Sequence, residues 1–132
     1  MSARSFDLAV MAGAAAEYAA NRFWLRWVLP DPLRYFLICW GNDIFAGAFL
    51  LAWLNLLLSL GGLRPLIRLR YTVPLLLVCG LAWEILAPLW KPAAVFDPWD
   101  FLAYQAGGLL YLALRRALDI LTGSPGGQRT GN

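Results

Sequence analysis

The chain has 132 residues, of which 61% are hydrophobic and 14% are charged, and it contains no histidine. A soluble domain is about half apolar and about one quarter charged, so this chain has too few polar residues to cover a soluble surface. Without histidine, and with only two cysteines, it lacks the ligand sets of classical zinc, haem and iron–sulfur sites. A Ser-His-Asp or Cys-His catalytic pair is excluded for the same reason, and we expect no cofactor. The net charge of +3 fits basic cytoplasmic loops and does not indicate nucleic-acid binding.

The first segment of the chain allows three interpretations. It is Ala-rich and apolar from Leu8 to Ala20 apart from Glu17, and it ends in interleaved aromatic and basic residues. It can be a signal peptide, an interfacial amphipathic helix, or a transmembrane helix from about Phe6 to Trp27. Asp7 stands where the apolar core of a signal peptide should begin, which disfavours the first interpretation. We therefore predict a helix here that is weak or interfacial.

Three later segments are apolar and long enough to cross a bilayer, which takes about 20 helical residues. They are Tyr35–Leu60, Tyr71–Trp90 and Trp99–Leu121. The third is long enough only if its two arginines extend to the membrane interface. We expect breaks at Pro30/Pro32, Gly61–Pro65 and Lys91–Ala94. Pro74 and Pro88 should bend the second of these segments or end its last turn, because proline lacks the N–H and crowds the preceding carbonyl.

The predicted fold is all-α, a polytopic transmembrane bundle of four helices over residues 1–122, followed by a disordered polar tail over residues 123–132. Basic residues favour the cytoplasmic side of a membrane. If the first segment spans, Arg4 joins the side that holds the Gly61–Arg70 loop, and that side has seven basic residues against four on the other. If the segment lies on the surface, the same side has six basic residues against five. The clearer bias favours four spans with both termini inside.

Polar side chains recur at one depth in three of the predicted helices. At 1.5 Å per residue, Asp43 lies about 12 Å inward along its helix, and Glu84 and Gln105 each lie about 9 Å inward, all counted from the same side. We predict that Asp43 and Glu84 approach each other directly or through one water. The candidate binding residues are Asp43, Glu84, Asp97, Asp100, Tyr104 and Gln105, with the aspartates 97 and 100 at the mouth of this layer.

Small residues follow the same helix faces, which indicates close packing between helices. Gly80 lies one turn before Glu84, and Gly47 one turn after Asp43. An acidic side chain on such a face points to protein or to a water-filled cavity rather than to lipid. A purely structural interpretation also stands, in which Glu84 only locks the helices together. In the same way, Asp97-Pro98 with Asp100 makes a good helix start without any function.

The segment Leu81–Gly108, LAWEILAPLWKPAAVFDPWDFLAYQAGG, resembles the signature of the VanZ-like family, small bacterial membrane proteins related to a teicoplanin-resistance factor. The matching residues are Glu84, Asp97, Asp100, Gly107 and Gly108. Tyr104 stands where the family usually has Asn, and Ala87 where it often has Gln. The resemblance implies a multi-pass protein of the bacterial plasma membrane, but it supplies no reaction.

Two classes of function follow from these observations. In the first, the chain is a non-enzymatic membrane protein whose outward acidic pocket binds a lipid head group, a glycopeptide or a metal ion, in antibiotic or envelope-stress resistance. In the second, it is a small membrane enzyme that acts on a lipid or isoprenoid carrier, with Glu84 as general base and Asp100 as metal ligand. An accessory subunit of a membrane complex is the remaining alternative. Membrane lipid is the expected partner, and a homo- or hetero-oligomer stays open.

Overall fold

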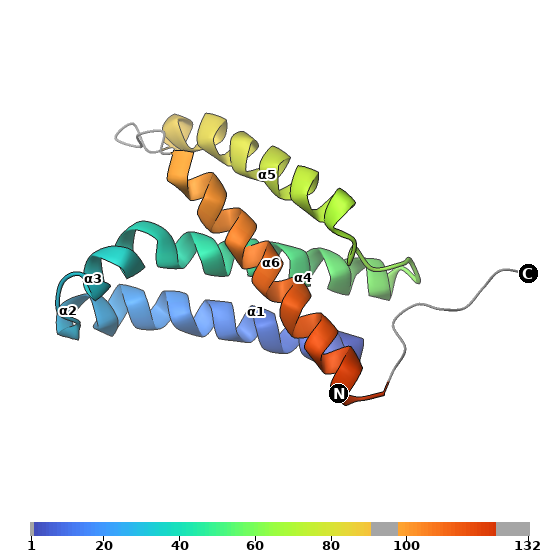
Figure 1. Cartoon of the computed structure of the whole chain (residues 1–132). Coiled ribbons are helices and arrows are strands. Elements are labelled where there is room, and N and C mark those ends of the chain that lie inside the picture. Colours follow the sequence, from blue (N-terminus) through green and yellow to red (C-terminus); the bar gives the residue numbers. More distant parts are fainter. Residues whose placement is uncertain (1, 91–97, 124–132) are drawn as a thin grey trace, which may run out of the picture.

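The computed structural model describes residues 2–90 and 98–123, and these residues form helices joined by short connections, with no strand among them (Figure 1). The predicted all-α architecture of four helices is confirmed for this part of the chain. The first helix consists of α1 (Ala3–Ala20), the π-helical turn η1 (Asn21–Leu25) and α2 (Arg26–Val28). The second consists of α3 (Leu33–Phe36), the π-helical turn η2 (Leu37–Gly41) and α4 (Asn42–Leu60). The third and fourth are α5 (Leu69–Trp90) and α6 (Pro98–Leu121).

Local signals explain where the helices begin and end. The hydroxyl of Ser2 accepts a hydrogen bond from the Ser5 N–H at 3.1 Å, which caps α1 and starts it before the predicted Phe6. Gly62, at φ +69°, ends α4, with Leu63 N–H bonded to Leu58 O at 2.8 Å as in a Schellman motif.

The prolines of the third helix do not interrupt it. α5 continues through Pro74 and ends at Trp90, shortly after Pro88. The predicted break at 91–94 lies outside the described residues, as does the predicted polar tail except Gly123.

Close backbone contacts hold the helices together. α1 lies along α4, α6 crosses α4 diagonally, and α5 packs on α6 (Figure 1). A Cβ added at Gly107 would collide with the backbone carbonyl of Ile44, and one at Gly47 would collide with that of Tyr104. At Gly80 it would lie 3.1 Å from the Phe101 ring. The small residues therefore let α4, α5 and α6 approach closely, as the sequence predicts.

A buried polar network ties α1 to the bundle at the end where the chain begins. The Tyr111 hydroxyl donates to Asp7 Oδ1 at 2.7 Å and accepts from Asn55 Nδ2 at 2.9 Å. The Asn55 amide also bonds both backbone groups of Leu66, in the connection between α4 and α5. Arg115 lies 3.5 Å from Asp7. Asp7 is thus an internal anchor of the first helix, whereas the sequence reasoning used it only against a signal peptide.

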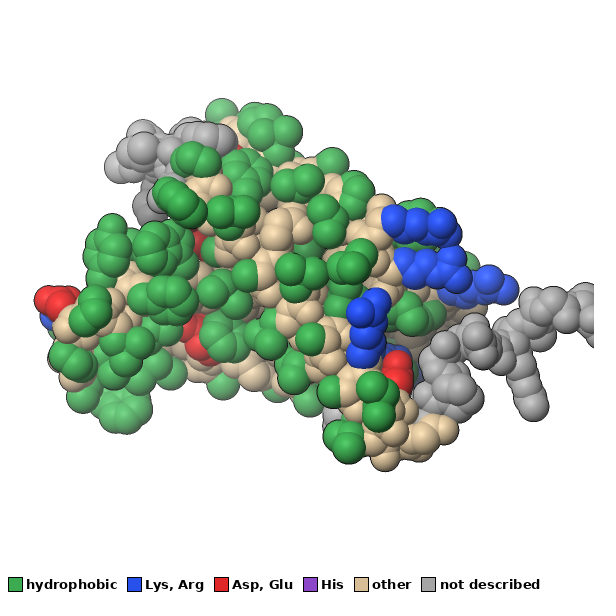
Figure 2. Space-filling model, in the orientation of Figure 1, with side chains coloured by type: hydrophobic (Ala, Val, Ile, Leu, Met, Phe, Trp, Pro, Cys, Tyr) green, Lys and Arg blue, Asp and Glu red, His purple; other side chains and the backbone are tan. Residues whose placement is uncertain are grey.

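The surface combines apolar helix sides with a basic end. Two of the described helices, Leu33–Leu60 and Leu69–Leu86, are long and apolar enough to cross a membrane. Hydrophobic side chains cover most of the face in Figure 2, and arginine side chains gather at the end where α5 begins. Arg4 donates to the Ser59 hydroxyl at 2.7 Å, so the N-terminus lies at that same end. This is the placement of Arg4 that the four-span interpretation requires.

Candidate functional site

Tyr104, in the second turn of α6, is the common neighbour of three carboxylates from three helices. Its hydroxyl interacts electrostatically with Asp43 of α4, Asp100 of α6 and Glu84 of α5. All four residues are partly buried. The electrostatic environment of Tyr104 thus includes acidic side chains from α4, α5 and α6.

The packing glycines explain why these carboxylates meet. Asp43 lies one helical turn before Gly47, where α4 approaches the backbone of Tyr104 most closely. Glu84 lies one turn after Gly80, which contacts Phe101. Residues four apart share a helix face, so Asp43 and Glu84 lie on the faces of α4 and α5 that pack against α6.

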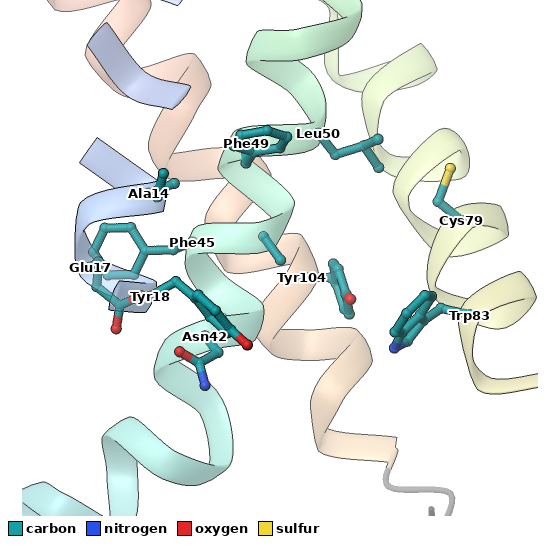
Figure 3. A pocket seen from close by; sticks show the side chains of 12 residues that line it. Ala14, Glu17, Tyr18, Asn42, Phe45, Phe49, Leu50, Cys79, Trp83 and Tyr104 are labelled. Atoms are coloured by element: carbon teal, nitrogen blue, oxygen red, sulfur yellow. The ribbon is translucent and has the colours of Figure 1, made fainter. Parts of the chain in front are cut away.

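A cavity of about 480 Å³ lies beside Tyr104 and is open on one side. Its walls come from α1, α4, α5 and α6, and Figure 3 shows Trp83 and Cys79 of α5 on one side and Glu17 and Tyr18 of α1 on the other. Most of the lining is apolar, including Phe45 and Phe49. The cavity is thus mainly apolar, and it includes the Glu17 carboxylate and Tyr104, the residue that interacts electrostatically with Asp43, Glu84 and Asp100.

Glu17 is a site residue that the sequence reasoning did not select. Both of its carboxylate oxygens are buried and have no hydrogen-bond partner among the described residues. A Cβ at Gly41 would lie 3.7 Å from Glu17 Oε1, so the glycine leaves room for this side chain against the second helix. The signal was available, since Glu17 is the only charge between Leu8 and Ala20, and an ionisable residue in an apolar segment is by default a candidate for function.

The remaining predicted residues have different positions. The Gln105 amide donates to the backbone carbonyl of Val73 at 3.3 Å, so it faces the first turns of α5. Asp97 lies outside the described residues, and with it the predicted cap, although α6 does begin at Pro98 as predicted. The direct approach of Asp43 to Glu84 stays a prediction.

Metal binding has no geometric support in this part of the chain. Among residues 2–90 and 98–123, no group of three or more Cys, Asp or Glu side chains is arranged to hold a metal ion. An organic cation needs no such set of converging ligands, because one or two carboxylates are enough to pair with an ammonium group.

Comparisons of the chain with protein-family models, with curated proteins and with solved structures found no match. The resemblance to the VanZ-like family accordingly stays a prediction from the residues between Glu84 and Gly108. What the site binds has to be argued from its geometry, because no relative supplies a ligand.

Proposed function

We propose that the chain is a multi-pass membrane protein that binds the ammonium group of an amphiphilic ligand in the cavity beside Tyr104. The observation that carries the proposal is the position of Tyr104, which lines the cavity and interacts electrostatically with Asp43, Glu84 and Asp100. A cationic group near these carboxylates gains favourable Coulomb energy where the dielectric constant is low. An ammonium group also offers several N–H donors to carboxylate oxygens.

The membrane location is supported by the helices and their surface. Two helices meet the length and hydropathy of a span, and α1 and α6 lie against them in the same bundle. Large apolar side chains such as Trp53, Leu77 and Leu109 are exposed on α4, α5 and α6. Exposed apolar surface of this kind is rare on soluble monomers and usual against lipid. All four helices then cross the bacterial plasma membrane, with the basic end in the cytoplasm.

The cavity wall favours an amphiphile over a small inorganic ion. Phe45, Phe49 and Leu50 offer apolar surface to a hydrocarbon chain. Tyr104 and Trp83 also line the cavity, and aromatic faces attract ammonium groups. The ligand that fits both parts carries a positive group on an apolar body.

Fluorescence titration of the purified protein with octylammonium tests this proposal, with octanol as the uncharged comparison, because Trp83 lines the cavity. We expect octylammonium to bind at least about tenfold more tightly than octanol, as one charge-assisted hydrogen bond contributes about 1.5–3 kcal/mol. Glu84→Gln and Asp43→Asn should each remove about this advantage. The matched control is Asp31→Asn, which neutralises an exposed aspartate outside the cavity.

Equal binding of octylammonium and octanol by the wild-type protein would overturn the proposal. If Glu84→Gln and Asp43→Asn kept wild-type affinity for octylammonium but unfolded more easily, the carboxylates would serve only to hold the helices together. In that case the interpretation of the chain as an accessory subunit would replace ligand binding.

A further inference from the structure

A second, smaller pocket of about 210 Å³ adjoins the cavity at its α1 side. It lies between the two π-helical turns, with Asn21 and Arg22 from η1 and Ile38 from η2 in its lining. Tyr18 and Asn42 line both the pocket and the cavity, so the two spaces meet at these residues. π-helical turns inside α-helices are frequent at functional sites.

Two asparagines fix one wall of this pocket. Asn21 is 4% exposed, and its Nδ2 donates to Leu37 O at 3.1 Å and to Asn42 Oδ1 at 3.0 Å. Leu37 begins η2, where the shift to a π pattern changes the partners of the backbone carbonyls, and Asn21 supplies a donor there. Because Asn42 uses its oxygen in this bond, its NH₂ group is left to donate to a ligand.

The charged groups of the pocket are both cationic. Arg22 and Arg26 line it, and neither makes an ion pair within residues 2–90 and 98–123. Arg34 differs from them, because it pairs with Asp31 at 3.0 Å. Two guanidinium groups and an amide NH₂ are donors only, and such a set matches the oxygens of a phosphate.

We infer that the ligand is an aminophospholipid, with its phosphate at Arg22 and Arg26 and its ammonium group toward the carboxylates around Tyr104. Asn42 and Tyr18 line both spaces, so the phosphate pocket adjoins the cavity that Tyr104 lines. The apolar wall of the cavity then receives an acyl chain. This inference rests on the proposed function and adds the phosphate site and the lipid class to it.

A membrane lipid fits this site better than a free phosphate for two reasons. The phosphate pocket opens into the larger apolar cavity, which a free anion would leave empty. Phe23, Trp24 and Trp27, next to the two arginines in the chain, are exposed, and aromatic residues beside arginines mark the head-group level of a bilayer. A lipid places its phosphate at that level.

Native mass spectrometry of the full chain in detergent tests the inference with phosphatidylethanolamine, and with phosphatidylglycerol as the phospholipid without an amine. We expect the wild-type protein to retain phosphatidylethanolamine in preference to phosphatidylglycerol. The double variant Arg22→Gln/Arg26→Gln should retain phosphatidylethanolamine about tenfold less, since it loses charge-assisted bonds to the phosphate. It should keep wild-type affinity for octylammonium, and Arg34→Gln, the matched control, should keep both ligands.

Two results would overturn the inference while leaving the proposed function intact. One is wild-type retention of phosphatidylethanolamine by the double arginine variant, provided that Glu84→Gln still loses octylammonium. The other is displacement of phosphatidylethanolamine by excess inorganic phosphate, which would make a free anion the ligand. If Glu84→Gln instead binds both octylammonium and phosphatidylethanolamine as the wild-type protein does, the proposed function itself fails.

Discussion

At the scale of a single residue, variants of Glu84 distinguish a role in ligand binding from a role in helix packing. It interacts electrostatically with Tyr104, as do Asp43 and Asp100, and it shares a helix face with Gly80. A glutamine keeps the size and hydrogen-bonding capacity of this side chain but not its charge. A leucine removes both and leaves neighbouring polar groups without a bond.

Glu84→Gln should therefore leave the free energy of unfolding within about 0.5 kcal/mol of the wild type while it weakens octylammonium binding. Glu84→Leu should lower the free energy of unfolding by about 1–3 kcal/mol. Denaturant unfolding in detergent, followed by tryptophan fluorescence, measures both variants. Equal stability of the glutamine and leucine variants would contradict the position of Glu84 among polar neighbours.

The second prediction at this scale concerns the hydroxyl of Tyr111. It joins Asp7 of α1 to Asn55 of α4, and Tyr111→Phe removes only this oxygen. We expect a loss of about 1–3 kcal/mol in the free energy of unfolding, because two buried groups lose a partner. Tyr71→Phe, at an exposed tyrosine, is the control and should change little. An unchanged unfolding midpoint for Tyr111→Phe would mean that the network does not hold α1 in place.

At the scale of helices, the structure depends on the close approach of α4 and α6. A Cβ at Gly107 would overlap the Ile44 carbonyl of α4, a backbone atom that cannot turn aside as a side chain does. Gly107→Ala should therefore lower the thermal unfolding midpoint clearly. Gly13→Ala is the matched control, because a Cβ there meets nothing within 4 Å, and alanine favours a helix over glycine by about 0.5–1 kcal/mol. A midpoint for Gly107→Ala at or above that of Gly13→Ala would contradict this packing.

Sequence patterns predicted the helices well and their mutual crossing less well. Apolar runs between prolines and glycines located all four helices, because such runs and breaks are local properties. Counting depth from helix ends put Gln105 in one layer with Asp43 and Glu84 and left open whether Tyr104 or Gln105 lies beside them, and the structure has the Gln105 amide bonded to the Val73 carbonyl of α5. α6 crosses the bundle diagonally, and a crossing angle is set by side-chain packing that a depth count does not contain.

The two π-helical turns were not predicted, and they account for the residues of the smaller pocket that the sequence reasoning did not select. A π turn inserts one residue into a helix, and it produces no distinctive spacing of hydrophobic residues in the sequence. Asn21 and the pocket arginines stand at these turns. Glu17, by contrast, carried a readable signal as the lone charge in its segment.

At the scale of the whole molecule, the proposed topology places the two ends of the bundle on opposite sides of the membrane. Arg4 and the connection 61–68 lie at one end, and Pro30 lies in the connection at the other. In a background without Cys39 and Cys79, Leu63→Cys should resist a membrane-impermeant thiol reagent in intact cells, and Pro30→Cys should react. Swapped reactivity would reverse the orientation, and equal reactivity of both would argue against a spanning bundle.

The most direct test of the central claim is to locate a bound ammonium amphiphile by NMR. In detergent-solubilised protein, isotope-filtered nuclear Overhauser spectra report which side chains contact octylammonium. We predict contacts from its chain to Phe45 and Phe49 and from the carbon next to nitrogen to the Tyr104 ring, all lost with excess phosphatidylethanolamine. Contacts confined to exposed residues such as Leu60 and Leu121, unchanged in Glu84→Gln, would contradict the account.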